Sequence, residues 1–214
     1  DGSADLSQVE RVTRDIAQAA NGFKLVVEKS TVPVNTCEWV RRTLRMFTAH
    51  DGEFDVASMP EFLREGKGVY DFFYPDRIVI GSRSQQAAQR MKELYGPILS
   101  GELPSLPIEW SPPGPSPGSH ETGGKVPLVE TDIASAQMIK YASNAFLATR
   151  ISFINEIAGL CGKVGDDVTE GGRGMGFDPR IGHSYLEAGL GFGGPCLEKV
   201  LKALMNLPEG NAHD

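Results

Sequence analysis

The sequence predicts an α/β fold in which a parallel sheet is followed by a long helix and shorter helical pieces. Helical and β-rich segments alternate over roughly the first hundred residues, which is typical of parallel strands joined by helices. An apolar pattern at helical spacing then continues for about thirty residues. The chain has 214 residues, 40% of them hydrophobic and 23% charged, which suits a globular protein with a sizeable core.

The first elements follow in order along the chain. Apolar residues at helical spacing mark the first helix, namely Leu6, Val9, Val12, Ile16 and Ala20. Short β-rich runs at 24–28, 54–57 and 77–81 predict strands. A helix carrying Val40, Leu44 and Phe47 follows the first strand, and Ser84 caps another helix that reaches about Tyr95.

The second half differs in character. Six prolines and five glycines interrupt residues 101–124, so we predict a surface insertion there, with a recognition role for Pro112-Pro113-Gly114-Pro115 as the weaker alternative. The long helix opens at Thr131-Asp132 and ends near Gly162 or Gly165, about 45 Å away. Helices of this length join domains or form subunit interfaces. We therefore expect one domain at 1–130 and a second at 131–214.

Composition excludes several classes of protein. A net charge of −7 argues against nucleic-acid binding, and no apolar run approaches the length of a membrane span. The three cysteines are Cys37, Cys161 and Cys196, an odd number without CxxC pairs, and the four histidines show no ligand spacing. We expect reduced thiols, a cytoplasmic location, surface histidines and no metal.

Cys196 is the first candidate for chemistry, because glycines surround it in Gly191-Phe192-Gly193-Gly194-Pro195-Cys196. Glycine lets a backbone approach a ligand closely, and a thiolate is a strong nucleophile. A buried structural cysteine is the alternative. A thiol hydrolase without a cofactor is a third reading, but it normally needs a histidine partner, and the sequence points to none.

Two pairs of polar residues have the i, i+4 spacing of one helix face. Lys140 and Asn144 lie in a helix that is small and apolar nearly all round, where they would need an anionic partner such as an oxyanion. Glu61 and Glu65 follow Pro60, which is placed to start a helical turn at the end of a strand. A solvated helix face is the alternative for the glutamates.

Two further stretches are considered as ligand-binding segments. Ser30 and Thr31 also follow a strand, where they would cap a helix or face a ligand. Residues 189–194 satisfy GxGxxG, but residues 183–188 before them lack strand alternation, so we reject a dinucleotide fingerprint there.

Together these segments resemble the UDP-glucose and GDP-mannose dehydrogenase family, and within it the members that act on UDP-glucose. The motifs that carry the resemblance are Glu28-Lys29-Ser30-Thr31-Val32-Pro33, Pro60 to Gly66, Pro75 to Gly81, Lys140 to Asn155 and Gly191 to Cys196. The resemblance implies an incomplete Rossmann-like sheet, a long connecting helix and a helical dimerisation region. It also implies a homo-oligomer formed through the long helix.

The resemblance further implies NAD-dependent oxidation of UDP-glucose to UDP-glucuronate in two steps, through a thioester on Cys196. Lys140 and Asn144 would stabilise the oxygen on C6, Glu61 would accept a proton during thioester hydrolysis, and Thr31 would lie near the reacting atoms. The implied NAD-binding positions are Ser30, Thr31, Val32, Glu65 and Lys199. The implied substrate-binding positions are Glu61, Phe62, Leu63, Lys140, Asn144, Arg180, Leu190, Gly191, Phe192 and Gly193, the last four within a loop at 187–193 that wraps the sugar nucleotide.

The chain also departs from the family pattern. The first βαβ unit with its glycine fingerprint and the second nucleotide-type domain are absent from the 214 residues. Val200 stands at a family aspartate, which predicts that Lys140 lacks a neighbouring counter-charge, and Gly171-Gly172 should weaken a helix. We therefore expect weak NAD binding and little turnover. The alternatives are a non-catalytic dimerisation fragment or decayed paralogue, and a family member acting on GDP-mannose or a UDP-N-acetyl sugar.

Overall fold

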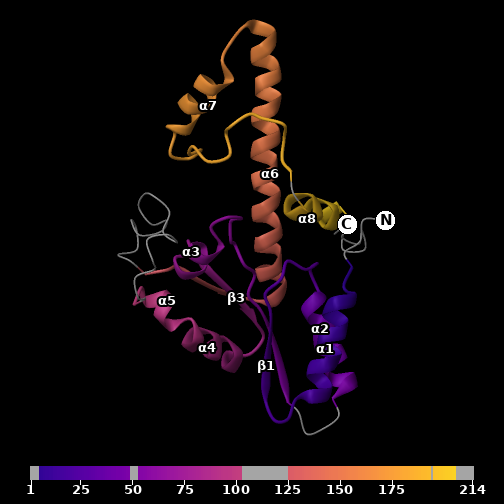
Figure 1. Ribbon diagram of the computed structural model, residues 1–214. Helices are drawn as coiled ribbons and strands as arrows, with labels where there is room; N and C mark the ends of the chain where they lie inside the picture. The colour runs from indigo at the N-terminus through magenta and orange to yellow at the C-terminus, as the bar shows by residue number, and fades with distance from the viewer. Residues whose placement is uncertain (1–4, 49–52, 103–124, 194, 206–214) are drawn as a thin grey trace, which may run out of the picture. The chain divides into compact units, whose positions relative to one another are not determined.

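A computed structural model describes residues 5–48, 53–102, 125–193 and 195–205 (Figure 1). The described residues form two compact units, 5–140 and 141–205, and the division between them falls inside the long helix. The insertion predicted at 101–124 lies almost wholly outside the described residues. Among the described helices, none is both long enough and apolar enough to cross a membrane.

A four-stranded sheet organises the unit of residues 5–140. Its strands are β1 (Lys24–Glu28), β2 (Phe54–Ser58), β3 (Ile78–Ser82) and β4 (Leu128–Thr131), and they lie side by side in that order. The predicted alternation of strands and helices is confirmed, but one pair breaks the predicted parallel pattern. Strands β1 and β2 are parallel, as are β3 and β4, whereas β2 and β3 are antiparallel.

The connection between β2 and β3 explains the antiparallel pair. Its only helix is the short α3 (Gly68–Phe73). Antiparallel neighbours need no crossover helix, so β3 can run back beside β2 after a short connection. Ala57 pairs with Ser82 and Ser58 with Gly81, so the carboxyl ends of β2 and β3 lie side by side.

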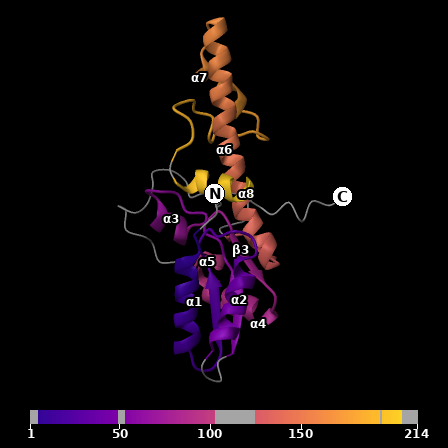
Figure 2. The same ribbon diagram turned by 90° about the vertical axis from the view of Figure 1, so that its right-hand side faces the viewer.

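Helices cover both faces of the sheet (Figures 1 and 2). On one face lie α1 (Ser7–Ala19) and α2 (Thr36–Phe47), which share a core with Val26 and Val56. On the other lie α4 (Gln85–Leu94) and α5 (Gly96–Ser100), which share a core with Ile78 and Ile80. The predicted cap is confirmed, because the Ser84 hydroxyl accepts a hydrogen bond of 3.0 Å from the Ala87 backbone N–H.

The predicted long helix is α6 (Ile133–Val164), with 32 residues. Its first turns pack closely on the sheet, because a Cβ on Gly81 would lie 2.6 Å from the Cβ of Ala136. Gln137 adds two hydrogen bonds: its side-chain oxygen accepts from the Asn35 N–H at 3.1 Å, and its amide donates to the Cys37 sulfur at 3.3 Å. These contacts fix the start of α6, and with it Lys140, on this unit.

The unit of residues 141–205 contains the rest of α6, together with α7 (Val168–Gly176) and α8 (Pro195–Met205). Gly171 and Gly172 do not prevent α7 from forming. A Cβ on Gly172 would lie 2.8 Å from the Leu186 carbonyl oxygen, so the loop can pack on α7 only where a side chain is absent.

Two side chains of α6 hold the loop that follows α7. Arg150 donates to the carbonyl oxygens of Ile181 at 2.7 Å and Gly182 at 2.9 Å. One turn and a half further on, the Asn155 side chain accepts a hydrogen bond of 3.1 Å from the Gly189 N–H. Both ends of the loop are therefore tied to the same helix.

Candidate active site

The loops after β1 and β2 leave the sheet at the same edge. The two strands pair in register, with Glu28 opposite Ser58. The Met59 N–H also donates to the Glu28 carbonyl oxygen at 2.9 Å, which continues the pairing past the ends of the strands. In open α/β sheets, ligands bind at the carboxyl ends of the parallel strands. This edge carries most of the predicted site residues of the first unit.

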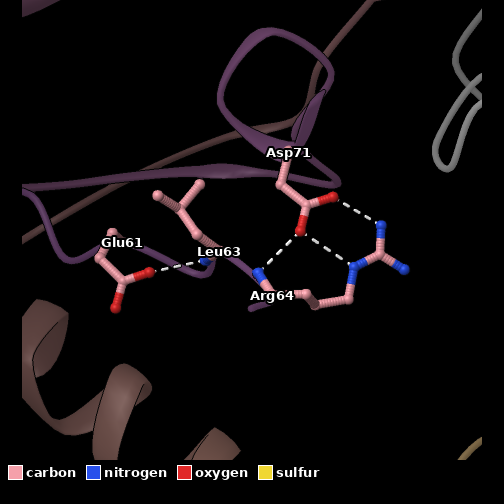
Figure 3. A network of polar contacts seen from close by, with 4 residues as sticks. All are labelled: Glu61, Leu63, Arg64 and Asp71. Atoms are coloured by element: carbon pink, nitrogen blue, oxygen red, sulfur yellow. Dashed lines mark hydrogen bonds and ion pairs between the residues drawn. The ribbon is translucent and has the colours of Figure 1, made fainter. Parts of the chain in front are cut away.

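A buried ion pair joins this edge to α6. The Lys140 Nζ lies 3.2 Å from Glu61 Oε1, and 7% of the lysine side chain and 28% of the glutamate side chain are exposed. The second oxygen of Glu61 accepts a hydrogen bond of 2.6 Å from the Leu63 N–H (Figure 3). The prediction that Lys140 lacks a counter-charge is therefore wrong, because Glu61 supplies one.

The helical turn predicted after Pro60 is also wrong. Residues 59–64 form neither helix nor strand, a turn follows at Glu65 and Gly66, and the two glutamates do not share a helix face. The Glu61 carboxylate binds the backbone two residues ahead, a local contact that competes with helix formation. Glu65, assigned to the cofactor, is exposed.

Asp71 on α3 holds the segment of residues 59–64 in place through hydrogen bonds to Arg64. Its carboxylate accepts hydrogen bonds from the Arg64 backbone N–H at 2.7 Å and from the Arg64 guanidinium at 3.0 and 2.6 Å (Figure 3). Burial alone would raise the pKa of Asp71, but the hydrogen bonds and charge of Arg64 outweigh it and the pKa is lowered. The segment that carries Glu61 is thus held at both ends.

Two cations lie close to the Phe62 ring. The Arg77 guanidinium carbon is 3.8 Å from the ring centroid, and Lys140 Nζ is 5.3 Å from it. The antiparallel register of β2 and β3 explains the first contact, because continuing that register places Phe62 opposite Arg77. The structure therefore brings together three predicted residues, Glu61, Phe62 and Lys140, whereas Leu63 is 39% exposed.

Lys29 belongs to the same cluster, although sequence reasoning assigned it no role. Burial lowers the pKa of its ammonium group, the charge of Lys140 lowers it further, and the charge of Glu61 opposes both. Lys29 follows β1 directly, as Ser30 and Thr31 do. Its position at a strand end was the signal that could have identified it.

The predicted cofactor residues after β1 differ in exposure. Ser30 is exposed and its N–H donates to the Glu28 carboxylate at 2.9 Å, whereas Thr31 is half-buried. Val32 is 5% exposed and packs in the core, so only its backbone can face a ligand. Ser30 and Thr31 both follow β1 directly, at the carboxyl edge of the sheet. Residues 183–188 form no strand, which confirms that 189–194 are not a dinucleotide fingerprint.

The remaining predicted residues belong to the unit of residues 141–205. Asn144 is half-buried on α6, one turn beyond Lys140, and Lys199 is exposed on α8. Cys196 occupies the first turn of α8, and its side chain lies outside the described residues. Arg180 is exposed and pairs with Asp178 at 2.6 Å.

The predicted sugar-nucleotide loop at 187–193 is mostly exposed, with Phe192 half-buried and Gly193 exposed. Leu190 is fully exposed, and Gly191 has a φ of 109°, which favours glycine. Arg150 and Asn155, which hold this region on α6, were not recognised as such in the sequence. The sequence signal that could have identified them is the presence of polar residues on a helix that is otherwise largely apolar.

Val200 is fully buried against Tyr141 and Ala203. The Tyr141 hydroxyl is buried and has no hydrogen-bond partner among the described residues. Burial raises the pKa of Tyr141 to about 12. An apolar side chain at position 200 thus packs beside a hydroxyl whose hydrogen bonding is not satisfied.

Among the other cysteines and the histidines, Cys37, Cys161 and His183 belong to the described residues. Cys37 is buried, and burial followed by the charge of Glu28 raises its pKa to about 12. His183 is exposed and packs edge-on against Phe177, whereas His50, His120 and His213 lie outside the described residues.

Comparison with known structures first defines the class of fold. The structure superposes on a UDP-glucose dehydrogenase from Pyrobaculum islandicum with a TM-score of 0.81 and 38% identity, over 96% of this chain and 42% of that one. It superposes on a UDP-D-ManNAc dehydrogenase from Pyrococcus horikoshii with a TM-score of 0.74 and 27% identity, over 98% of this chain and 43% of that one. The fold is that of Rossmann-like nucleotide-sugar dehydrogenases.

Sequence comparison then gives the family. Residues 1–99 match the NAD binding domain of the UDP-glucose/GDP-mannose dehydrogenase family, and residues 134–214 match its central domain. The chain is 42% identical over its whole length to UDP-glucose 6-dehydrogenase YwqF of Bacillus subtilis strain 168. It belongs to the UDP-glucose/GDP-mannose dehydrogenase family, and it spans about 43% of the length of that relative.

Proposed function

We propose that this chain carries part of the site of an enzyme that oxidises the C6 alcohol of UDP-glucose to a carboxylate with NAD as the oxidant. The observation that carries the proposal is the Lys140 and Glu61 ion pair. A desolvated cation and a carboxylate at the carboxyl edge of a sheet are the groups needed to stabilise a developing oxyanion and to accept a proton.

Two NAD molecules, bound in turn, would each accept one of the two hydrides that leave C6. Ser30 and Thr31 are the residues of the first unit that would hold NAD. Thr31, half-buried beside the strand end, would also orient the reacting groups.

The Cys196 thiolate would add to the carbonyl carbon of the C6 aldehyde, forming a C–S bond while the carbonyl electron pair moves to oxygen. Lys140 and Asn144 would stabilise that oxygen. Loss of hydride from the adduct leaves a thioester. Glu61 would accept a proton from water as it attacks, the C–S bond breaks, and Cys196 leaves as a thiolate. The first turn of a helix, where Cys196 lies, favours an anion.

Sequence identity favours UDP-glucose among the possible nucleotide sugars. Identity is 42% and 38% to two UDP-glucose dehydrogenases but 27% to the UDP-D-ManNAc dehydrogenase. GDP-mannose and UDP-N-acetyl sugars remain the alternative substrates, and NADH production with each sugar nucleotide distinguishes them.

Val200 favours a second candidate, a non-catalytic member of the family. A fully buried valine replaces the carboxylate that the family pattern places there. We expect little NADH from UDP-glucose and NAD with the chain as it stands, and more with Val200→Asp than with Val200→Asn, which adds polarity without charge. Sustained turnover by the unsubstituted chain would exclude the non-catalytic function.

We also propose that the chain self-associates through α6. Phe146, Phe153 and Leu160 recur every seven residues, so they share a helix face, and they are 61%, 46% and 56% exposed. Phe153→Glu should shift the chain from dimer to monomer in sedimentation velocity, whereas Glu156→Gln should not. A cytoplasmic location stays a prediction from the sequence.

A further inference from the structure

Two lysines share one carboxylate at the carboxyl edge of the sheet. Lys140 pairs with Glu61, and Lys29 lies within electrostatic range of both. The other cation of the cluster is Arg77, whose charge is opposed by the neighbouring Asp76. The cluster thus has an excess of positive charge in a protein whose net charge is −7.

Lys29 is the cation without a direct partner. It is half-buried, and it makes no hydrogen bond or ion pair with any of the described residues. The adjacent carboxylate of Glu28 accepts a hydrogen bond of 2.9 Å from the Ser30 N–H and forms no ion pair with Lys29. A partly desolvated ammonium group without a partner is costly, unless an anion arrives to pair with it.

The backbone places Lys29 opposite Met59, two residues before Glu61. The register of β1 and β2 and the hydrogen bond from Met59 to Glu28 hold the residues after the two strands next to each other. Lys140 approaches from α6, which Gly81 and Gln137 seat on the same unit. The arrangement leaves two ammonium groups positioned around one shared carboxylate.

We propose that Lys29 and Lys140 together bind a carboxylate ligand, with Lys29 as a direct contact. The identity of this carboxylate rests on the proposed function: it is the C6 carboxylate of the oxidised sugar. Its negative charge neutralises the excess positive charge, and Lys29 holds it after the C–S bond has broken. Lys29 is thus a ligand-binding residue of the reaction in addition to Lys140.

Titration of the ¹³C-lysine-labelled chain with sodium glucuronate tests this proposal. The ε-carbon signals of Lys29 and Lys140, assigned with the two Lys→Met variants, should shift saturably with glucuronate but not with glucose or with sodium chloride at equal ionic strength. Lys29→Met should weaken binding about tenfold, as expected for one charge-assisted contact. Lys29→Arg should keep the affinity within about threefold.

Lys24→Met is the matched control. Lys24 is an exposed lysine at the first position of β1, at the opposite end of the strand from Lys29. This substitution should leave glucuronate binding unchanged. Equal affinity in Lys29→Met and the unsubstituted chain would overturn the proposal, as would signals that fail to move or that respond to inorganic phosphate alone. If Lys29→Met does not fold, the signals of the unsubstituted chain and of Lys29→Arg decide.

The titration needs neither nucleotide, NAD nor Cys196, so it separates the two proposals. Glucuronate binding through Lys29 without any reaction of Cys196 with a sugar-nucleotide aldehyde would refute the proposed function and leave the carboxylate site standing. The reverse result would refute the role of Lys29 alone.

Discussion

Replacing Glu61 should destabilise the protein more than replacing its partner Lys140. Glu61→Gln keeps the side-chain shape and an acceptor for the Leu63 N–H, but it leaves the buried Lys140 and the half-buried Lys29 without their shared counter-charge. Lys140→Met removes the buried charge and leaves a partly exposed carboxylate that keeps its other contacts. The two substitutions therefore have unequal consequences, although they break the same ion pair.

The geometry sets the magnitude. At 3.2 Å and an effective dielectric constant near 20, the attraction between Lys140 and Glu61 is about 5 kcal/mol before desolvation is counted. Leaving one partner of a fully buried pair unpaired costs about 3–5 kcal/mol, and 28% exposure of Glu61 lowers this. We expect Glu61→Gln to lower the free energy of unfolding by about 2–3 kcal/mol and Lys140→Met by about 1 kcal/mol or less.

Urea denaturation followed by tryptophan fluorescence measures these changes, because Trp39 and Trp110 both belong to the first 140 residues. The double variant should recover most of the loss seen in Glu61→Gln. Glu130→Gln is the control, since it breaks the exposed pair with Lys92 and should change stability by less than about 0.5 kcal/mol. A loss in Lys140→Met equal to or greater than that in Glu61→Gln would refute the reasoning, as would additive effects in the double variant.

Three further predictions concern packing and thiol chemistry. Gly171→Ala should stabilise α7 by about 0.5–1 kcal/mol, whereas Gly172→Ala should destabilise the chain by about 1–3 kcal/mol, because only at Gly172 would a Cβ meet the Leu186 carbonyl; urea denaturation followed by circular dichroism decides, and equal effects would contradict the close approach. Tyr141→Phe should leave stability unchanged or raise it by up to about 1 kcal/mol in thermal unfolding, because the hydroxyl has no partner among the described residues; a loss of 1–2 kcal/mol would reveal one. The raised pKa of Cys37 keeps its contribution to stability constant below about pH 8. Stability then falls as the pH rises toward 12, because the unfolded chain loses the thiol proton first. Cys37→Ala should therefore flatten the slope of the unfolding free energy between about pH 8 and pH 10.5, and Cys161→Ala should not.

The order and type of the elements could be predicted from the sequence, because periodicity and capping are local. The helix from Ile133 to Val164 and the cap at Ser84 follow from residues close together in the chain. The antiparallel pairing of β2 and β3 could not be predicted in this way. It depends on the length and conformation of the segment between the strands, whose only helix is the short α3.

The sequence could predict which residues belong to the site where they lie in a family motif. It could not predict which of these residues contact one another. Lys140 and Glu61 were candidates from their spacing and from the family pattern, but their pairing joins segments 79 residues apart. Val200 at a family aspartate suggested that Lys140 had no counter-charge, because the sequence did not show that Glu61 pairs with it. In the structure, residues 59–64 form no helix, and the Glu61 carboxylate pairs with Lys140.

The lowered pKa of Lys29 also depends on residues that are distant in the sequence. A lysine after a strand is normally solvated, and only the parallel register of β1 and β2 places this one beside Glu61. Because this cluster is partly buried, Lys29 becomes a candidate ligand-binding residue.

The reaction of Cys196 with the C6 aldehyde of UDP-glucose tests the central claim most directly, because this step needs no NAD. The measurement is the rate at which iodoacetamide alkylates Cys196 and Cys161, followed by peptide mass spectrometry with and without the aldehyde. The proposed chemistry predicts that the aldehyde slows alkylation of Cys196 through reversible C–S bond formation, leaves Cys161 unaffected, and loses its effect in Lys140→Met. Unchanged alkylation of Cys196, or equal slowing at both cysteines, would contradict it.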